Sequence, residues 1–234
     1  MKGTSFTVGP NEVLGLLGPN GAGKSTTFNM LTLDLTMTHG AVRMLNRDLT
    51  ENMEDVFLQM GMCPQHNPIW EKLTVLEHLE IFADLKGLNE SDKKDQMFYL
   101  IKSLKLEDYV HVNAENLSGG NKRKLCTAIA QMACPMVSFF DEPTTGVDPV
   151  SRRNLWFSLK NSSGLKGGSL VLTTHRMDEA ETLCDKIAIM INGRFVCFGS
   201  PQQLRNKYGQ GYYITILPME NDDGSFSKFR NYSL

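Results

Sequence analysis

The chain has 234 residues, and its 24 basic and 26 acidic side chains leave a formal net charge of −2. Hydrophobic residues make up 41% of the sequence and charged residues 21%, which is typical of a packed domain and argues against wholesale disorder. The near-neutral charge excludes the strong basic footprint of a dedicated nucleic-acid binder. No apolar run reaches the roughly 18 residues that a membrane-spanning helix needs.

The cysteine and histidine spacings argue against a disulfide framework and against a zinc site. The cysteines are odd in number and no pair has C-x-x-C spacing, so we expect reduced, mostly buried thiols. They are Cys63, Cys126, Cys134, Cys184 and Cys197. The histidines also lack metal-binding spacing, and only His175 belongs to a motif described below.

The first part of the chain predicts a strand, a glycine-rich turn and a helix. The apolar run at 13–17 predicts a buried strand that enters the turn at Gly18, and residues 24–35 have helical character. Further on, we predict a strand at 41–45 and a turn at 46–48.

The rest of the chain alternates helices and strands after one long helical stretch. That stretch covers 73–106, where Thr74 and Glu77 have the spacing of a capping box. The predicted helices that follow are 121–133, 151–160 and 177–184, and the predicted strands are 136–140, 169–173, 186–191 and 194–198. The last two strands form a predicted hairpin across Asn192 and Gly193. This alternation predicts an α/β core with a parallel sheet, into which a helical subdomain is inserted.

A phosphate-binding loop follows the first predicted strand. Residues 18–25 match G-x-x-x-x-G-K-[ST] in full and lie between a strand and a helix. The glycines let the backbone N–H groups face one phosphate chain, and the helix N-terminus adds partial positive charge. Lys24 is expected to reach the β- and γ-phosphates, Ser25 to bind Mg²⁺ and Thr26 to lie near the α-phosphate. The candidate nucleotide-binding residues of this loop are Gly18, Pro19, Asn20, Gly21, Ala22, Gly23, Lys24, Ser25 and Thr26.

Two acids stand at the end of a second buried strand. Asp141 and Glu142 follow the apolar residues 136–140, at the strand end where ligands bind in open parallel sheets. Asp141 is a candidate Mg²⁺ ligand. Glu142 is placed to polarise the attacking water as general base.

Four further motifs, in order, resemble those of ATP-binding-cassette (ABC) ATPases. Residues 117–121, Leu-Ser-Gly-Gly-Asn, resemble the ABC signature. Gln65 resembles the Q-loop glutamine, Asp148 the D-loop aspartate and His175 the switch histidine. The resemblance covers roughly residues 3–205. At position 121 the chain has Asn where most cassettes have Gln, and in this respect it resembles the A-type (ABCA-like) transporters. These are mostly lipid exporters or lipid-handling transporters.

The resemblance implies a P-loop NTPase (RecA-like) core with an antiparallel β subdomain and an inserted α-helical subdomain. We expect an ABC ATPase domain at 1–210, with the core at 1–65 and 116–205 and the insertion at 66–115. Residues 211–234 are expected to be a C-terminal extension that is truncated.

The resemblance also implies that two cassettes meet head to tail and hydrolyse ATP with Mg²⁺. Ser118, Gly119, Gly120 and Asp148 are then expected at the partner's nucleotide. Gln65 is expected to contact Mg²⁺ and the water, and His175 the γ-phosphate. The implied catalytic residues are Glu142, His175, Gln65 and Lys24, and the implied metal ligands are Ser25, Gln65 and Asp141. The implied location is the cytoplasmic face of a membrane, as part of a multi-pass protein whose transmembrane domain contacts the helical subdomain after Gln65.

One departure from the family pattern, one basic stretch and two alternative functions complete these expectations. The adenine-stacking aromatic of the family is expected before Met1, so Phe6 is not assigned and we expect the first strand of the fold to be missing. Residues 122–124, Lys-Arg-Lys, are expected to be a solvated helix face rather than a nucleic-acid patch. One alternative function is a soluble ABC ATPase acting on macromolecular assemblies, but only about fifty residues separate Gln65 from Ser118, too few for the long coiled coils of that class. The other is a scaffolding cassette, against which Glu142 and His175 argue.

Overall fold

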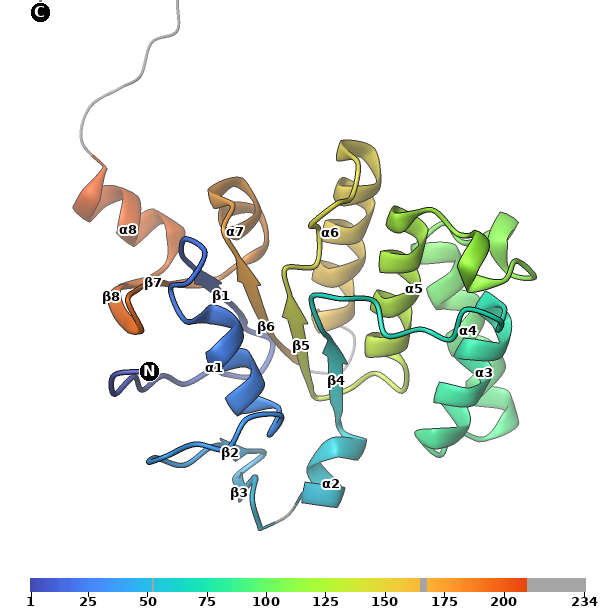
Figure 1. Ribbon diagram of the computed structural model, residues 1–234, viewed down its shortest axis with the longest axis horizontal. Helices are drawn as coiled ribbons and strands as arrows, with labels where there is room; N and C mark the ends of the chain where they lie inside the picture. Colours follow the sequence, from blue (N-terminus) through green and yellow to red (C-terminus); the bar gives the residue numbers. More distant parts are fainter. Residues whose placement is uncertain (52, 165–167, 210–234) are drawn as a thin grey trace, which may run out of the picture.

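The computed structural model describes residues 1–51, 53–164 and 168–209 (Figure 1). Within these ranges the main sheet has six strands in the order β4-β5-β6-β1-β7-β8. Their bounds are β1 Val13–Leu17, β4 Met60–Cys63, β5 Val137–Asp141, β6 Ser169–Thr174, β7 Lys186–Ile191 and β8 Arg194–Gly199. Neighbouring strands are parallel except β8, which runs antiparallel to β7. The predicted α/β fold is confirmed, while the extension at 211–234 lies outside the described residues.

Helices cover the sheet and gather at its β4 edge. They are α1 Lys24–Leu31, α2 Met53–Leu58, α3 Val75–Leu85, α4 Glu90–Ser103, α5 Gly119–Gln131, α6 Pro149–Gly164, α7 Met177–Leu183 and α8 Pro201–Tyr208. Two short 3₁₀ turns lie at Glu107–Tyr109 and Ala114–Asn116. Figure 1 shows α3 and α4 on the far side of α5 from the sheet.

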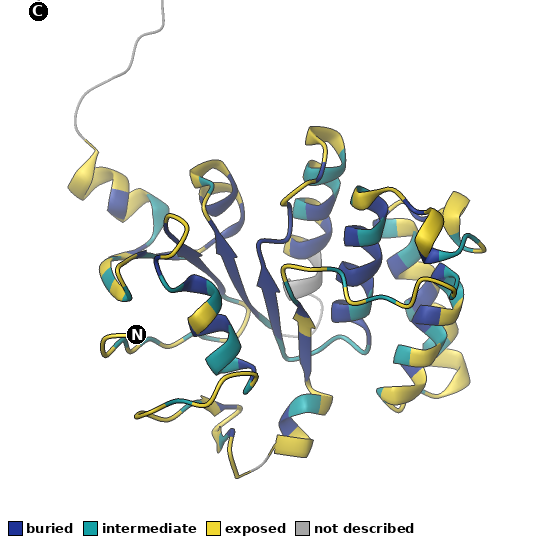
Figure 2. Cartoon of the chain, in the orientation of Figure 1, coloured by how far each residue is buried: buried dark blue, intermediate teal, exposed yellow. Residues whose placement is uncertain are grey.

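The central strands are buried because helices cover both faces of the sheet. All five residues of β1 are buried, as expected for a parallel strand with no solvent-facing side. Phe139 and Phe140 of β5 are 2% and 0% exposed, respectively, which confirms their assignment to the core. In Figure 2 the central strands are dark blue, and the exposed residues lie on the outer helices and loops.

The helical region after β4 packs against α5 and forms a second hydrophobic core with it. Thr74 caps α3, and the predicted capping box with Glu77 is present in full. The predicted helical stretch at 73–106 is in fact two helices, because Gly87 turns the chain at φ 72° and Asn89 caps α4. The shared core includes Leu79 and Ala83 of α3, Met97 and Leu100 of α4, and Leu125 and Ala128 of α5.

Two predictions between α1 and β4 are wrong in detail. The first helix ends at Leu31 rather than at residue 35, and Leu33 adopts φ 59° two residues later. The predicted strand at 41–45 is shorter, β2 Arg43–Met44, and it pairs with β3 Arg47–Asp48, which had been assigned to the turn. The turn itself is Leu45 and Asn46, both at positive φ, the backbone that a two-residue hairpin requires. The predicted small antiparallel sheet is therefore present, with a shifted turn.

The remaining differences are additions and small shifts of boundaries. The short elements α2, β4 and α8 were not predicted as such. The predicted hairpin of β7 and β8 is confirmed, with Asn192 at φ 50° and Gly193 at φ 75° between the strands. Gln65 is carried by the segment that leaves β4, so this unpredicted strand places one of the candidate catalytic residues.

Candidate active site

The phosphate-binding loop connects β1 to α1 and has the shape that its glycines allow. A Cβ on Gly18 would lie 2.4 Å from the backbone oxygen of Met190, so no larger residue fits there. Gly23 is the N-cap of α1 at φ 105°, and no side chain caps this helix. The hairpin holds the loop from behind, since the N–H of Gly193 donates to the oxygen of Ala22 over 2.8 Å. The first turn of α1 is thus built to receive an anion.

Lys24 extends from the start of α1 back over its own loop. Its ammonium group donates to the backbone oxygens of Gly18, at 2.9 Å, and Pro19, at 3.2 Å. The same Nζ lies 3.7 Å from Oε1 of Glu142, and the Lys24 side chain is only 5% exposed. A positive charge therefore stands between the loop and the acidic end of β5.

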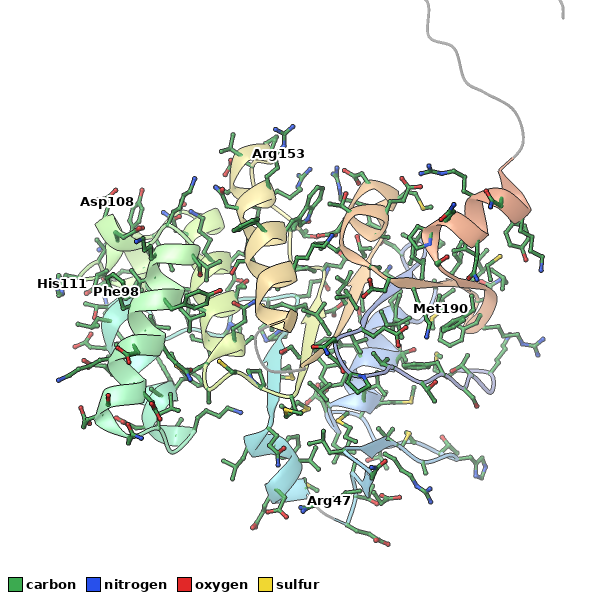
Figure 3. The ribbon with its side chains drawn as sticks, turned by 180° about the vertical axis from the view of Figure 1, so that it is seen from behind. Arg47, Phe98, Asp108, His111, Arg153 and Met190 are labelled. Carbon is green, nitrogen blue, oxygen red and sulfur yellow. The ribbon has the colours of Figure 1, made fainter. Side chains whose placement is uncertain are left out.

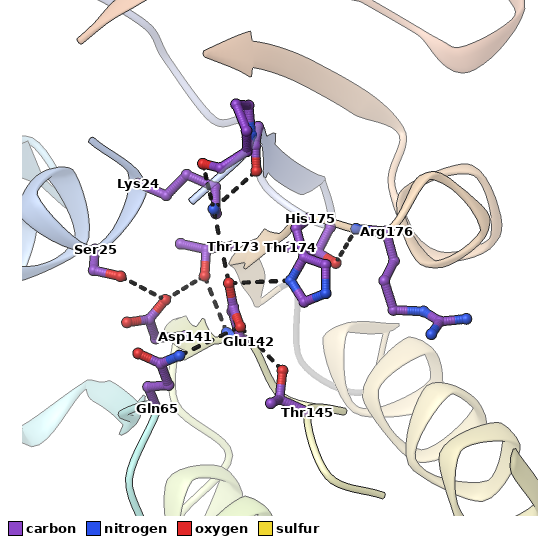
Figure 4. A network of polar contacts seen from close by, with 12 residues as sticks. Lys24, Ser25, Gln65, Asp141, Glu142, Thr145, Thr173, Thr174, His175 and Arg176 are labelled. Carbon is purple, nitrogen blue, oxygen red and sulfur yellow. Dashed lines mark hydrogen bonds and ion pairs between the residues drawn. The ribbon is translucent and has the colours of Figure 1, made fainter. Parts of the chain in front are cut away.

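Glu142 is the point on which the candidate catalytic side chains converge (Figure 4). Gln65 Nε2 and Thr145 Oγ1 both donate to its Oε2, at 3.4 Å and 3.0 Å. His175 Nδ1 lies 3.3 Å from its Oε1. Glu142 itself adopts φ 46°, a left-handed backbone that is uncommon outside glycine. Three segments of the chain, around residues 65, 142–145 and 175, therefore meet at one carboxylate, which Lys24 of α1 also approaches.

The surroundings of Glu142 keep its carboxylate ionised. Burial on its own would raise the pKa of Glu142, but hydrogen bonds from His175 and Thr145 and the charge of Lys24 together outweigh it, so the pKa is lowered. An ionised carboxylate can only accept, so the Nδ1 atom of His175 carries the proton in their contact. Glu142 is thus available as an acceptor at neutral pH.

Asp141 lies beside Ser25 and is hydrogen-bonded to a residue that was not assigned from the sequence. The Ser25 hydroxyl donates to Asp141 Oδ1 over 3.4 Å. Thr173, at the end of β6, donates its hydroxyl proton to the same Oδ1 and accepts the N–H of Glu142 at 3.0 Å. Thr173 therefore orients both acids. Its position two residues before His175, in Leu-Thr-Thr-His, is the only sequence signal that could have found it.

The chemistry of these side chains fits a shared Mg²⁺ site. Ser25 and Asp141 present a hydroxyl and a carboxylate, and Gln65 adds an amide oxygen, all of them hard oxygen donors. Across the ranges that the structure describes, no group of three or more His, Cys, Asp or Glu residues could hold a metal by itself. A single carboxylate with a hydroxyl and an amide oxygen suits Mg²⁺, which is usually held by one or two carboxylates together with substrate phosphates and water.

The candidate residues of the signature and the D-loop lie elsewhere. Ser118 is the N-cap of α5, its hydroxyl accepts the N–H of Asn121 at 3.2 Å, and Gly119 beside it is exposed. Asp148 caps the start of α6 by accepting the N–H of Ser151 at 2.9 Å. A Cβ on Gly120 would lie 3.8 Å from Asp148 Oδ1, so the two motifs are neighbours. Figure 1 shows α5 apart from α1, on the other side of β4 and β5.

The expectation for residues 122–124 is wrong for two of the three. Arg123 is 2% exposed and Lys124 is 6% exposed, so these side chains form neither a solvated face nor a nucleic-acid patch. Only Lys122 is partly exposed. Arg123 donates hydrogen bonds to the segments that carry Gln65 and Glu142.

A second buried charge was not assigned from the sequence. Glu179 of α7 is 1% exposed and accepts three hydrogen bonds from uncharged groups. The donors are the hydroxyls of Thr144, at 2.9 Å, and Thr174, at 2.6 Å, and Trp156 Nε1, at 3.0 Å. Thr174 precedes His175 and Thr144 follows Glu142 by two positions, so Glu179 links the two sides of the site.

The cysteines behave as structural thiols. All five are free, and three of them are buried. Burial raises the pKa of Cys63 to about 11 and that of Cys126 to about 12. Thiols with such pKa values carry almost no thiolate at neutral pH and are therefore unreactive.

A glycine-rich loop between a strand and a helix, facing the acidic end of the parallel strand β5, defines the nucleotide-binding domain of a P-loop NTPase. Residues 1–145 match the family described as ABC transporter. The chain belongs to this family, as an ATP-binding domain.

The relatives of the chain are A-type members of the family, which confirms the subfamily resemblance. The chain is 40% identical over 216 residues to the cholesterol transporter ABCA5 of Rattus norvegicus, covering 92% of this chain and 13% of that protein. It is 46% identical over 209 residues to the retinal-specific phospholipid-transporting ATPase ABCA4 of Homo sapiens, covering 89% and 9%. The chain thus spans only a small part of the length of these relatives.

The fold is similar to solved ABC structures. An "ATP binding subunit of ABC transporter" has a TM-score of 0.80 and 30% identity, covering 87% of this chain and 85% of that one. A "nucleotide-free ATP-binding cassette from an ABC transporter" has a TM-score of 0.73 and 25% identity, covering 87% of each chain. No helix among the described residues has the length and apolar character needed to cross a membrane.

Proposed function

We propose that the chain is the ATP-hydrolysing motor domain of an A-type ABC transporter that moves lipid or another hydrophobic substrate. The observation that carries the proposal is the convergence of Lys24, Gln65 and His175 on the ionised carboxylate of Glu142. The names of the relatives, a cholesterol transporter and a phospholipid-transporting ATPase, support the lipid class.

The phosphate loop and α1 hold the triphosphate in this proposal. The N–H groups of the loop and of the first turn of α1 bind phosphate oxygens, and Lys24 neutralises charge on the β- and γ-phosphates. Ser25, Asp141 and Gln65 would hold Mg²⁺, which would supply positive charge to neutralise the phosphate oxygens. Thr26, which is exposed at the start of α1, lies near the α-phosphate.

Glu142 then activates the attacking water. The carboxylate accepts a hydrogen bond from the water and polarises it as the water oxygen attacks the γ-phosphorus and the bond to the bridging β–γ oxygen breaks. The lowered pKa of Glu142 keeps it in the accepting form at neutral pH. The amide of Gln65 donates a hydrogen bond to Oε2 of Glu142. From this position Gln65 orients the water beside the carboxylate.

His175 connects Glu142 to the γ-phosphate. Its Nδ1 proton is directed at Glu142 Oε1, and in the imidazolium form, in which both ring nitrogens are donors, Nε2 also donates to a phosphate oxygen. The His175 side chain is 45% exposed and so can be reached by a bound nucleotide. The switch histidine thereby keeps Glu142 in register with the phosphate that is attacked.

A second cassette completes the site, because the signature residues of this chain lie away from its own phosphate loop. Ser118 and Gly119 are exposed at the N-terminus of α5, where N–H groups and the helix dipole favour a phosphate. We infer a head-to-tail dimer in which Ser118, Gly119, Gly120 and Asp148 face the partner's nucleotide.

The helical region after Gln65 is the proposed contact with the transmembrane part. It carries exposed apolar side chains: Trp70 is 51% exposed, Leu85 65% and Phe98 68%. Figure 3 shows Phe98 and His111 at the edge of this region, far from the sheet. Such a contact places the domain on the cytoplasmic face of a membrane. The transporter relatives favour this function over an ABC ATPase that acts on macromolecular assemblies.

The purified chain tests the proposal directly. We expect it to bind ATP and to release phosphate only with Mg²⁺, so that EDTA stops the release. Lys24→Ala is expected to weaken ATP affinity about tenfold or more, because it removes the cation that pairs with the phosphates. Thr50→Ala, at an exposed residue that follows β3, is the control and keeps the affinity of the parent chain. A chain that does not bind millimolar ATP, or Lys24→Ala with unchanged affinity, contradicts the proposal.

A further inference from the structure

The strongest feature that the proposed function does not use is the buried guanidinium of Arg123. The side chain is 2% exposed, although a charge taken out of water is costly unless every donor is satisfied. Arg123 lies in α5, five residues after the Ser118 cap. Hydrogen bonds to oxygen atoms of two other segments compensate for the lost hydration of the guanidinium.

The guanidinium donates to six oxygen atoms, five of which are backbone carbonyls. Nη1 donates to the oxygens of Pro64 and Gln65 and to the side chain of Asn67. Nη2 donates to the oxygens of Asp141, at 2.6 Å, and Glu142, at 3.1 Å, and Nε donates to that of Pro143 at 3.0 Å. Five N–H protons in one plane therefore join residues 64–67 to residues 141–143.

These are the two segments whose side chains meet in the active site. Gln65 Nε2 lies 3.4 Å from Glu142 Oε2, and the guanidinium of Arg123 donates hydrogen bonds to the backbone oxygens of both residues. Arg123 is in the same helix whose N-terminus presents Ser118 and Gly119. A shift of α5 is therefore passed to Gln65 and Glu142 together.

We propose that Arg123 is a positioning residue that makes the alignment of Gln65 with Glu142 depend on the position of the signature helix α5. It touches neither nucleotide nor water in this role, and it acts only through the backbone of the two segments. The expected effect of Arg123 on turnover rests on the proposed ATPase function, whereas its hydrogen bonds to the two segments do not. Lysine cannot replace arginine here, since one ammonium group lacks the fork that spans two segments.

The test compares Arg123→Lys and Arg123→Gln with the matched control Lys122→Gln, a charge loss at the adjacent, partly exposed helix position. Two properties are measured on the full chain: ATP affinity with turnover, and hydrogen exchange of backbone amides. For Arg123→Lys we expect turnover to fall at least about tenfold, since a misplaced catalytic group costs that much, with ATP affinity within about threefold of the parent chain. Arg123→Gln is expected to be slower still, and Lys122→Gln to match the parent.

Hydrogen exchange reports on the same variants without relying on turnover. We expect faster exchange at residues 65–70 and 142–146 in Arg123→Lys, and unchanged exchange in the hairpin at 186–199. Parent-like turnover and exchange in Arg123→Lys overturn the proposal. So does a uniform rise in exchange that includes the hairpin, because it shows a general loss of stability. If the parent chain does not hydrolyse ATP, the proposed function fails, and exchange alone decides the role of Arg123.

Discussion

Thr174, the residue before His175, donates its hydroxyl proton to the carboxylate of Glu179 over 2.6 Å. The same carboxylate accepts from Thr144 and from Trp156 of α6. Glu179 is thus a buried anion held by three uncharged donors. It joins the segment that carries His175 to the segment after Glu142 and to the helix that follows Asp148.

Replacing Glu179 is expected to destabilise the fold. In Glu179→Ala the buried Thr144 and Thr174 and the partly buried Trp156 lose their acceptor, and we expect the free energy of unfolding to fall by roughly 2–4 kcal/mol. Glu179→Gln keeps one acceptor oxygen and is expected to cost about half as much. Urea unfolding measures both, with Glu181→Ala as the control because its ion pair with Arg205 is exposed. A cost for Glu179→Ala no larger than that of the control contradicts the role given to the buried carboxylate.

Glu142→Gln separates binding from hydrolysis. The amide keeps the size of the side chain but is a poor proton acceptor, so we expect turnover to slow by about 10²–10⁴, or about 3–5 kcal/mol. ATP affinity is expected to stay close to that of the parent chain, since the phosphate loop is unchanged. Phosphate release and equilibrium ATP binding are measured side by side. Near-normal turnover in this variant rules out Glu142 as the general base.

Gly119→Asp tests the head-to-tail partner. A Cβ at Gly119 meets nothing within 4 Å, and a carboxylate in the first turn of a helix is well tolerated, so the single chain is expected to fold normally. In the proposed dimer the new charge faces the partner's γ-phosphate. In the Glu142→Gln background we therefore expect Mg·ATP to produce dimers in light scattering, and Gly119→Asp to abolish them. The control is Ser91→Asp, in the exposed first turn of α4. Dimers that persist in Gly119→Asp contradict the arrangement.

The contact between His175 and Glu142 is expected to weaken in acid. The pKa of Glu142 lies below its ordinary value of 4.5, so its ionised form stabilises the fold above that pH, and the contribution is lost as the pH falls through the lowered pKa. A double-mutant cycle of His175→Ala and Glu142→Gln measures the coupling free energy by urea unfolding. We expect a favourable coupling at pH 7 that is lost as the pH falls below 4.5 and through the lowered pKa of Glu142. A coupling that does not fall over this range means that the charge of Glu142 does not contribute to the contact.

The sequence predicted those parts of the site whose signal is local. The glycine spacing around Lys24 and the two acids after an apolar run are short patterns, and each carries its chemistry within a few residues. The parallel sheet followed in the same way from the order of apolar runs. The roles assigned to these residues remain predictions, although the structure places Lys24, Gln65 and Glu142 together.

The parts that were missed depend on residues far away in the chain. Arg123 looked like one of three solvated basic residues, because its acceptors lie 59 and 18 positions away, at Pro64 and Asp141. The strand β4 has only four residues, one of them glycine, and it is defined by its pairing with β5. At the β2–β3 hairpin Leu45 takes a positive φ, which is uncommon for a leucine and has no sequence signal.

The support that the hairpin gives to the phosphate loop has a consequence for the order in which the protein folds. Gly193 bonds to Ala22, and the oxygen of Met190 is the atom against which Gly18 fits. On the ribosome, the loop emerges some 170 residues before its support. A nascent chain that stops short of β7 contains all residues of the phosphate-binding motif but lacks the β7–β8 hairpin that contacts the loop. We therefore expect nucleotide binding to begin only after β7 and β8 of this domain have been made, although the phosphate-binding motif precedes them in the sequence.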